Sequence, residues 1–405
     1  MNKTSSIFSY LLKQIFIITF ILGVIAYGFI FNLGFSLTDE LCAFLFLILY
    51  IGYTVKYSLL GKEMLKTYSI LLFFFIYACF FGQNIPKAAL VDFIIISKPF
   101  LLFYICYYLP INFNKKFKKR LQIFCIAICF MCLFIGINTA TIRYFFGAEA
   151  QMASTISIAT ILYLYCSDKT SKDIKISILL LSVGLLSTRS KFYGFYISFL
   201  FIFFLAHKLK IKQGLSIRNI LFAIILIGTI LAATWEKTYG YVYTNGLSNE
   251  NTKDMIARPA LYMGMIEILK QYPLLGSGIG SYANHASAVY YSPIYYRLGY
   301  ENIWGLNPDM PAFAADTFFP TLAQYGFVGI FLFFLFWRKR FKEAKLYFGN
   351  SPNFIIHYKL CIVIFIFFLI ESLADSTFTQ NRGMFMMGLL GIILNEGKRL
   401  YSTKN

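Results

Sequence analysis

Long apolar segments separated by short polar stretches dominate the chain. Residues 70–81 and 361–370 are apolar on every side, whereas the strands of a transmembrane barrel would alternate with period two. About 20 apolar residues cross a hydrocarbon layer as a helix, which pairs its own backbone groups in lipid. The pattern therefore predicts an all-α, polytopic transmembrane bundle of about 12 helices. We expect them near residues 8–31, 40–60, 67–82, 88–109, 120–138, 150–166, 174–187, 191–206, 217–235, 313–337, 354–372 and 382–395.

One polar stretch is far longer than the others and runs over residues 236–312. It contains Trp304, many tyrosines and an amphipathic segment at residues 259–271, so we expect short helices against the membrane surface. Loops of this length inside a compact protein are usually functional. The predicted organisation is helices 1–9 over residues 1–235, the loop over 236–312, and helices 10–12 with a tail over 313–405.

The formal charge of +19 is distributed unevenly along this topology. With the N-terminus in the cytoplasm, 25 of the 37 Lys and Arg residues lie inside and ten outside, while Lys98 and Lys359 lie within helices or at their edges. The positive-inside rule then places both termini in the cytoplasm and the long loop outside. The basic charge is thus a topology signal, and nucleic-acid binding has no support.

The eight cysteines lie within or at the edges of apolar segments, which argues against a disulfide framework. Cys125, Cys129 and Cys132 share one helix face. A soft-metal site and simple packing between helices would both produce this spacing, and packing is favoured because no fourth ligand is evident. The N-terminal apolar segment is too long for a signal peptide, and we expect it to remain as the first helix.

The first candidate site is the tight outer turn 187–191, which carries Arg189 and Lys191 among three hydroxyls. Arginine suits bidentate phosphate contact, so the turn could bind an anion. Two cations snorkelling to the membrane interface would give the same pattern.

The second candidate is Arg258 with the glycine-rich stretch that follows, in which Gly276 and Gly278 precede Tyr282. Arg258 could extend from a helix start toward a phosphate, and the glycines permit close backbone approach. A structural turn explains the glycines equally well. No Lys-Ser or Lys-Thr follows them, which excludes a P-loop.

Asp316 is the third candidate, near the outer end of the predicted helix 313–337. A partly buried carboxylate there could act as a general base, or it could favour the helix dipole. His285 is the only histidine of the outer side and is either a base, a sugar ligand or an exposed loop residue. Arg297 and Arg382 are further outer cations that could bind substrate, and Arg382 could also pair with Asp375.

Three segments in this order resemble the O-antigen polymerase and ligase superfamily. They are LLSTRSKFYGFY, then ARPALYMGMIEILKQYPLLGSGIGSYANH, then DTFFPTLAQYGFVGIFLFFLFW, and the resemblance spans residues 185–337. It implies transfer of glycans from undecaprenyl diphosphate at the outer face of the bacterial cytoplasmic (inner) membrane. Arg189 and Arg258 would hold the lipid diphosphate. Ligases of the superfamily usually carry a histidine near the position of Asp316, so the aspartate favours a polymerase.

The resemblance implies an undecaprenyl-diphosphate-linked oligosaccharide and membrane lipid as partners, with a chain-length regulator and a flippase as further candidates. It implies an inverting glycosyltransferase without cofactor, and no metal is expected because the arginines supply positive charge. An O-antigen ligase and a flippase or transporter are the alternatives. Transporters often carry charges near the midplane, where this chain has little charge apart from Lys98.

Overall fold

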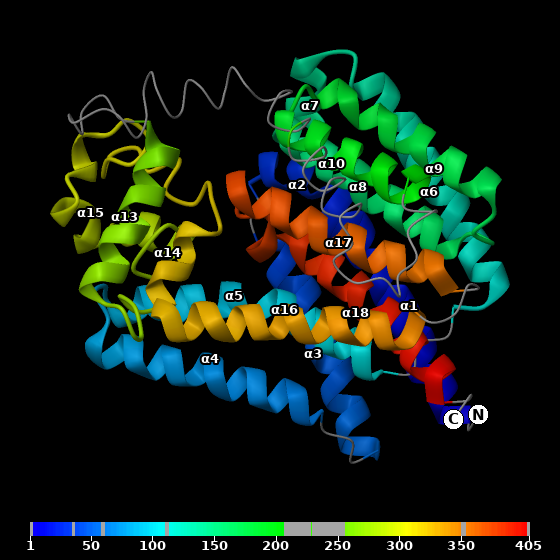
Figure 1. Ribbon diagram of the computed structural model, residues 1–405, viewed down its shortest axis with the longest axis horizontal. Coiled ribbons are helices and arrows are strands. Elements are labelled where there is room, and N and C mark those ends of the chain that lie inside the picture. Colours follow the sequence, from blue (N-terminus) through cyan, green and yellow to red (C-terminus); the bar gives the residue numbers. More distant parts are fainter. Residues whose placement is uncertain are drawn as a thin grey trace.

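The computed structural model in Figure 1 describes residues 3–34, 37–57, 61–109, 113–205, 228, 256–349 and 354–402. These residues form an all-α bundle, as the sequence predicts. The only β-type pairing among them is an isolated bridge between Asn307 and Met310.

Apart from α7 and α16, the helices of the bundle follow the predicted apolar segments. They are α1 (Lys3–Phe20), α2 (Tyr27–Asn32), α3 (Thr38–Tyr57), α4 (Lys62–Phe81), α5 (Pro86–Tyr108), α6 (Lys115–Ile135), α7 (Thr139–Phe146), α8 (Glu149–Cys166), α9 (Ser171–Ser182), α10 (Ser190–Leu200), α16 (Gly326–Phe348), α17 (Ile355–Ala374) and α18 (Asn381–Ser402). The predicted helix 217–235 lies outside the described residues.

Six of the described helices or helix combinations are long and apolar enough to cross a membrane. A seventh span arises if α7 and α8, bent by 71° relative to each other, count as one. The predicted number of about 12 is therefore not confirmed, although the polytopic bundle is. The short helix α7 was not predicted, because eight residues are too few to give a spanning signal.

The predicted start of the helix 313–337 is wrong. Residues 313–319 form turns, a 3-10 segment covers Pro320–Tyr325, and the α-helix begins only at Gly326. Gly326 has φ +60°, a left-handed conformation that interrupts a regular helix at this point. The break leaves Asp316 in irregular chain, outside any helix.

Helices α5 and α18 pack along each other in the centre of the bundle. Gly391 permits this close approach, because a Cβ there would lie 2.4 Å from the carbonyl oxygen of Phe103. Small residues at helix interfaces are a common device for close packing in membranes.

Cys125, Cys129 and Cys132 are fully buried on one face of α6, which packs against α8.

Residues 256–319, which we call the lid, fold into a unit at one end of the bundle (Figure 1). The lid contains α13 (Ala257–Gln271), α14 (His285–Val289) and α15 (Pro293–Arg297). Its own apolar core includes Leu261, Tyr282 and Tyr295. Several loop tyrosines thus serve as packing. The start of α1 and the end of α18 lie together at the opposite end of the molecule (Figure 1).

Candidate functional site

A cavity of about 1200 Å³ lies between the lid and the bundle. Its walls come from both halves of the chain and combine apolar side chains with many ionisable ones. The ionisable residues that line it are Asp39, Glu40, Asp92, Lys98, Arg189, Lys191, Arg258, His285, Asp316, Asp375 and Arg382.

The predicted tight turn at residues 187–191 forms one part of this wall. A 3-10 segment covers Val183–Ser187. The next residue, Thr188, has a φ of 52° and reverses the chain before α10 begins. Arg189 then pairs with Glu149 at the start of α8, and Glu149 also accepts from Arg143 at 2.8 Å. The turn is built to point two cations, Arg189 and Lys191, toward the cavity.

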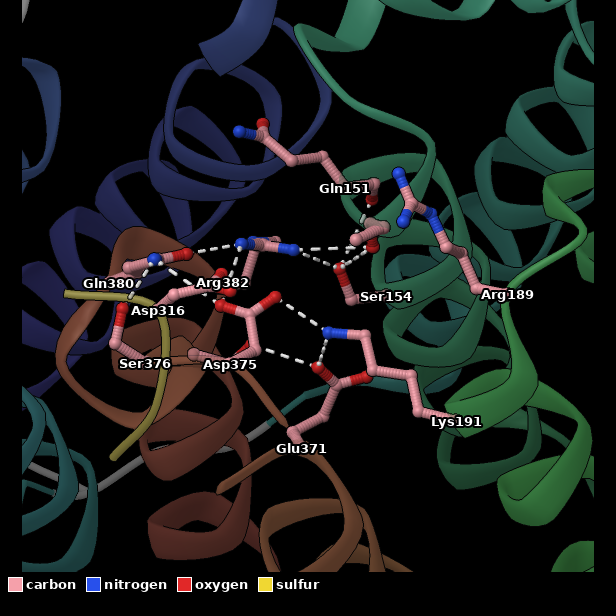
Figure 2. A network of polar contacts seen from close by, with 12 residues as sticks. Gln151, Ser154, Arg189, Lys191, Asp316, Glu371, Asp375, Ser376, Gln380 and Arg382 are labelled. Carbon is pink, nitrogen blue, oxygen red and sulfur yellow. Dashed lines mark hydrogen bonds and ion pairs between the residues drawn. The ribbon is translucent and has the colours of Figure 1, made fainter. Parts of the chain in front are cut away.

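Lys191 is held by two carboxylates, one from the last turn of α17 and one from the connection between α17 and α18. Its Nζ lies 2.6 Å from Glu371 and 2.6 Å from Asp375 (Figure 2). Burial disfavours the charge of Asp375, but Lys191 and Arg382 outweigh that effect and lower its pKa.

Arg382, at the start of α18, lies on the other side of Asp375 (Figure 2). It donates to the Ser154 hydroxyl at 2.7 Å and to Gln380, and its guanidinium lies 3.9 Å from Asp375. The predicted ion pair between Arg382 and Asp375 is thus present, although its N–O distance is near the upper limit for an ion pair.

Arg258 and Asp316 form a direct pair inside the cavity. Nε and Nη2 of Arg258 each lie 2.6 Å from the Oδ2 atom of Asp316. Burial raises the pKa of Asp316, and the neighbouring Asp375 adds to this, while Arg258 acts in the opposite direction. Two lid tyrosines fix the helix that carries Arg258: Tyr282 donates to the carbonyl of Leu261 at 2.7 Å, and Tyr300 donates to that of Ala260.

The four cations of this wall differ in accessibility. The side chains of Arg189 and Arg258 are 42% and 33% exposed, whereas those of Lys191 and Arg382 are 12% and 3% exposed. An incoming anion can therefore reach the first two directly. Lys191 and Arg382 are buried among fixed partners and organise the carboxylates around them.

The glycine-rich stretch forms a turn that joins the lid to the bundle. Gly276, Gly278 and Gly280 have φ of 74°, 91° and 81°, values that side chains rarely adopt. A Cβ on Gly278 would lie 2.8 Å from the Cα of Gly82, so the backbone of the turn packs directly on the end of α4. Gly276 and Gly278 are not among the cavity-lining residues, and this placement favours the structural reading of the turn.

Asp92 of α5 anchors the same turn from below. Its Oδ2 atom accepts from the Gly280 amide at 3.1 Å, from Asn284 at 3.2 Å and from Gln324 at 2.7 Å. Asp92 is 2% exposed, and buried polar groups of this kind are costly unless fully bonded. The carboxylate therefore locks the lid, the segment before α16 and α5 into one arrangement.

Three other predicted residues take different places. His285 is the first residue of α14, and its side chain faces the cavity. Desolvation and the nearby Lys98 lower the pKa of His285, which favours a neutral imidazole. Tyr282 is fully buried in the lid core and Arg297 bonds to Tyr272 and Gln83, so neither residue lines the cavity.

The acidic members of the site were not predicted, apart from Asp316 and Asp375. Four acidic residues near helix ends were missed, and each has a partner at least 40 positions away in sequence: Glu149, Glu371, Asp39 and Glu40. Lys98 gave the one usable signal, since it is a cation within an apolar segment. Its partners could be found only from the fold.

A family model described as O-antigen ligase (Wzy_C) matches residues 176–334. The resemblance to the O-antigen polymerase and ligase superfamily is confirmed. The match covers less than half of the chain but includes Arg189, Arg258 and Asp316. No curated protein matches the chain significantly.

Wzy_C proteins are glycosyltransferase-like membrane enzymes that act as ligases or polymerases. The family implies lipid-linked oligosaccharides in the membrane as substrates. Together with the apolar helices, it indicates a multi-pass protein of the bacterial inner membrane.

Proposed function

We propose that the protein polymerises undecaprenyl-diphosphate-linked oligosaccharide repeat units at the outer face of the cytoplasmic membrane. The observation that carries the proposal is the convergence of Arg189 and Arg258 on one cavity, with Asp316 bonded to Arg258. The two arginines come from separate elements within the region that matches the O-antigen ligase family. Their partial exposure suits them to grip a diphosphate.

In the proposed reaction, an acceptor hydroxyl attacks the anomeric carbon of the donor glycan. The bond from that carbon to the diphosphate oxygen breaks, and undecaprenyl diphosphate leaves with the bonding electron pair. Arg189 and Arg258 stabilise the charge that develops on the leaving oxygen, and one such preorganised donor is worth about 3 kcal/mol. The hydroxyl proton passes to the carboxylate of Asp316, with His285 as the second candidate base. We expect inversion at the anomeric carbon and no bound metal.

The ion pair between Arg258 and Asp316 implies that donor binding precedes proton transfer to Asp316. Arg258 holds Asp316 at 2.6 Å, so a diphosphate that attracts the guanidinium competes with the carboxylate for it. Donor binding would thereby release Asp316 from its salt bridge. The released carboxylate, with its raised pKa, becomes a better proton acceptor at the moment when the donor is in place.

Replacement of either arginine tests the proposal. Arg189→Ala and Arg258→Ala should each abolish polymer in cells while the protein stays in the membrane at its normal level. Lys270→Ala is the matched control, because Lys270 lies on the same helix as Arg258 but is exposed and, in the part of the chain that the structure describes, pairs with Glu267 alone. Normal polymer from either arginine variant would refute the roles assigned here.

A ligase acting on another acceptor is the closest alternative, and the products distinguish the two. Loss of a polymerase leaves products with a single repeat unit, whereas loss of a ligase leaves polymer on the lipid carrier. A flippase or transporter is the alternative from another class. Turnover of lipid-linked repeat units by the purified protein would decide for the enzyme.

A further inference from the structure

A second charged cluster lines the same cavity and is not used by the proposed reaction. The Nζ atom of Lys98, in the middle of α5, lies 2.5 Å from Asp39 and 2.6 Å from Glu40 at the start of α3. The side chains of Lys98 and Asp39 are almost fully buried, while that of Glu40 is 32% exposed. All three residues line the cavity.

This cluster is expensive for a membrane protein to keep. Charges within the membrane are costly, and a buried ion pair is often no more stable than apolar residues of similar size. Here two carboxylates also share one ammonium group, which leaves an excess negative charge. The second oxygen of Glu40, Oε2, meets no hydrogen-bond donor among the described residues. Stability of the fold therefore does not account for the cluster, and its unused bonding capacity points to a ligand.

The cluster adjoins the arginine-bearing wall of the cavity. The imidazole of His285 lies close enough to interact electrostatically with Lys98 and Asp39. The hydroxyl of Tyr27 interacts electrostatically with Asp39, with Glu40 and also with Arg382. A molecule seated on the Lys98 cluster would thus occupy the same cavity as the proposed diphosphate site.

We propose that Asp39, Glu40 and Lys98 form the subsite that binds the acceptor glycan of the transfer reaction. This inference rests on the proposed function. Carboxylates accept hydrogen bonds from sugar hydroxyls, and the ammonium of Lys98 can donate one in return. The excess negative charge would repel a diphosphate, so a neutral, polyhydroxylated ligand fits this wall while the arginines serve the anionic donor.

The test separates the two substrates by chemistry. The donor-only probe is the undecaprenyl-diphosphate-linked repeat unit with its acceptor hydroxyl replaced by hydrogen. The acceptor-only probe is the methyl glycoside of the same repeat unit, which has no leaving group. Purified full-length protein is assayed while each probe is varied in turn, which gives one KM for each substrate.

Glu40→Gln keeps the size of the side chain and removes its charge. Loss of a charge-assisted hydrogen bond should raise the acceptor KM about ten-fold or more, while the donor KM stays within about two-fold of the normal value. Asp39→Asn is the second variant and should act in the same direction. Glu63→Gln is the matched control, since Glu63 pairs with Lys339 on the surface away from the cavity.

Equal changes in both KM values, or a change in the donor KM alone, would overturn the subsite. So would a defect that a higher sodium or proton concentration restores, because that result assigns the cluster to a cation. Binding of the methyl glycoside is measured separately by saturation-transfer NMR. If the wild-type protein binds the glycoside, Glu40→Gln does not, and no transfer occurs, then the subsite stands and the proposed reaction falls. Failure of the wild-type protein to bind the glycoside overturns the subsite.

Discussion

Lys191 and Arg382 differ from Arg189 and Arg258 in what surrounds their charges. The Nζ atom of Lys191 lies between two carboxylates, and the guanidinium of Arg382 is enclosed by Ser154, Gln380 and Asp375. A ligand could reach these cations only by displacing several bonded partners. We infer that they set the position and charge of the carboxylates, whereas the two more exposed arginines are available to substrate.

This distinction predicts a loss of stability when Lys191 is replaced. Lys191→Met leaves Glu371 and Asp375 facing each other without their cation, and breaking a buried ion pair in this way costs about 3–5 kcal/mol. The thermal unfolding temperature in detergent should fall clearly below that of the wild type. Arg189→Met is the comparison, because its more exposed side chain should lower that temperature far less. Similar unfolding temperatures for the two variants would contradict the structural role of Lys191.

The raised pKa of Asp316 predicts how transfer depends on pH. A general base must be deprotonated, so the rate should rise with pH through the pKa of Asp316, which burial raises from its ordinary value. Rates of purified protein measured from acid to neutral pH should show this limb. Asp316→Asn should remove the limb and lower the rate by about 10²–10⁴-fold. If the rate of that variant still rose with pH in the same way, another group would be the base.

At the scale of elements, the position of the lid depends on the turn that contains Gly276, Gly278 and Gly280. Backbone groups of this turn bond to Gln83, Asn84 and Tyr77 from α4 and the α4–α5 connection. Asp92 adds the buried carboxylate that joins the turn to Asn284 and Gln324. Because Asn284 directly precedes His285, the same contacts fix one edge of the cavity.

Asp92 therefore offers a test of lid docking. Asp92→Leu removes an acceptor that three buried donors share. The Gly280 amide and Asn284 keep the Oε1 atom of Gln324 as an acceptor, whereas the side-chain amide of Gln324 loses its bond to Asp92, at a cost of about 1–3 kcal/mol. The lid should become susceptible to protease, and the unfolding temperature should fall. Asp92→Asn is the graded control, because all three donors bond to the one oxygen Oδ2, and an asparagine can still present one carbonyl oxygen there. Equal protease resistance of Asp92→Leu and the wild type would show that other contacts hold the lid.

The sequence predicted the membrane helices well because each one depends on local hydrophobicity. It placed both ends of α17 and the start of α18 to within two residues, although α18 continues to Ser402, beyond the predicted end at residue 395. It failed at residues 313–325, where the apolar run continues but Gly326 adopts a left-handed conformation imposed by packing against Leu274 and Gly276. Breaks of this kind depend on tertiary contacts, which hydropathy does not report.

In the candidate site, too, the features that depend on local sequence could be predicted, whereas those that depend on tertiary contacts could not. Arg189, Arg258 and Asp316 could be proposed from the sequence because they stand beside polar turns on the side that the charge pattern assigns to the outside. The pairing of Arg189 with Glu149 joins residues 40 positions apart, and that of Lys191 with Glu371 joins residues 180 apart. The local pattern of a single sequence does not indicate which distant residues form such pairs.

At the scale of the whole molecule, the remaining question is which end faces the cytoplasm. The lid lies at one end, and the start of α1 and the end of α18 lie at the other (Figure 1). The proposed reaction needs the lid on the outer side, and the distribution of Lys and Arg along the sequence predicts the same orientation. Chemical labelling can check whether the lid lies on the outer side of the membrane.

Two engineered cysteines, each added to the native protein, should report the orientation. Tyr296 is an exposed residue of the lid, and Lys66 is an exposed residue near the start of α4, away from the lid. A membrane-impermeant maleimide applied to intact spheroplasts should label Tyr296→Cys, whereas Lys66→Cys should react only after the membrane is opened. The native cysteines give little background, since all except Cys79 are buried. The reverse labelling pattern would put the cavity on the cytoplasmic side, where a polymerase of exported lipid-linked glycans has no substrate, and the proposed function would fall with the orientation.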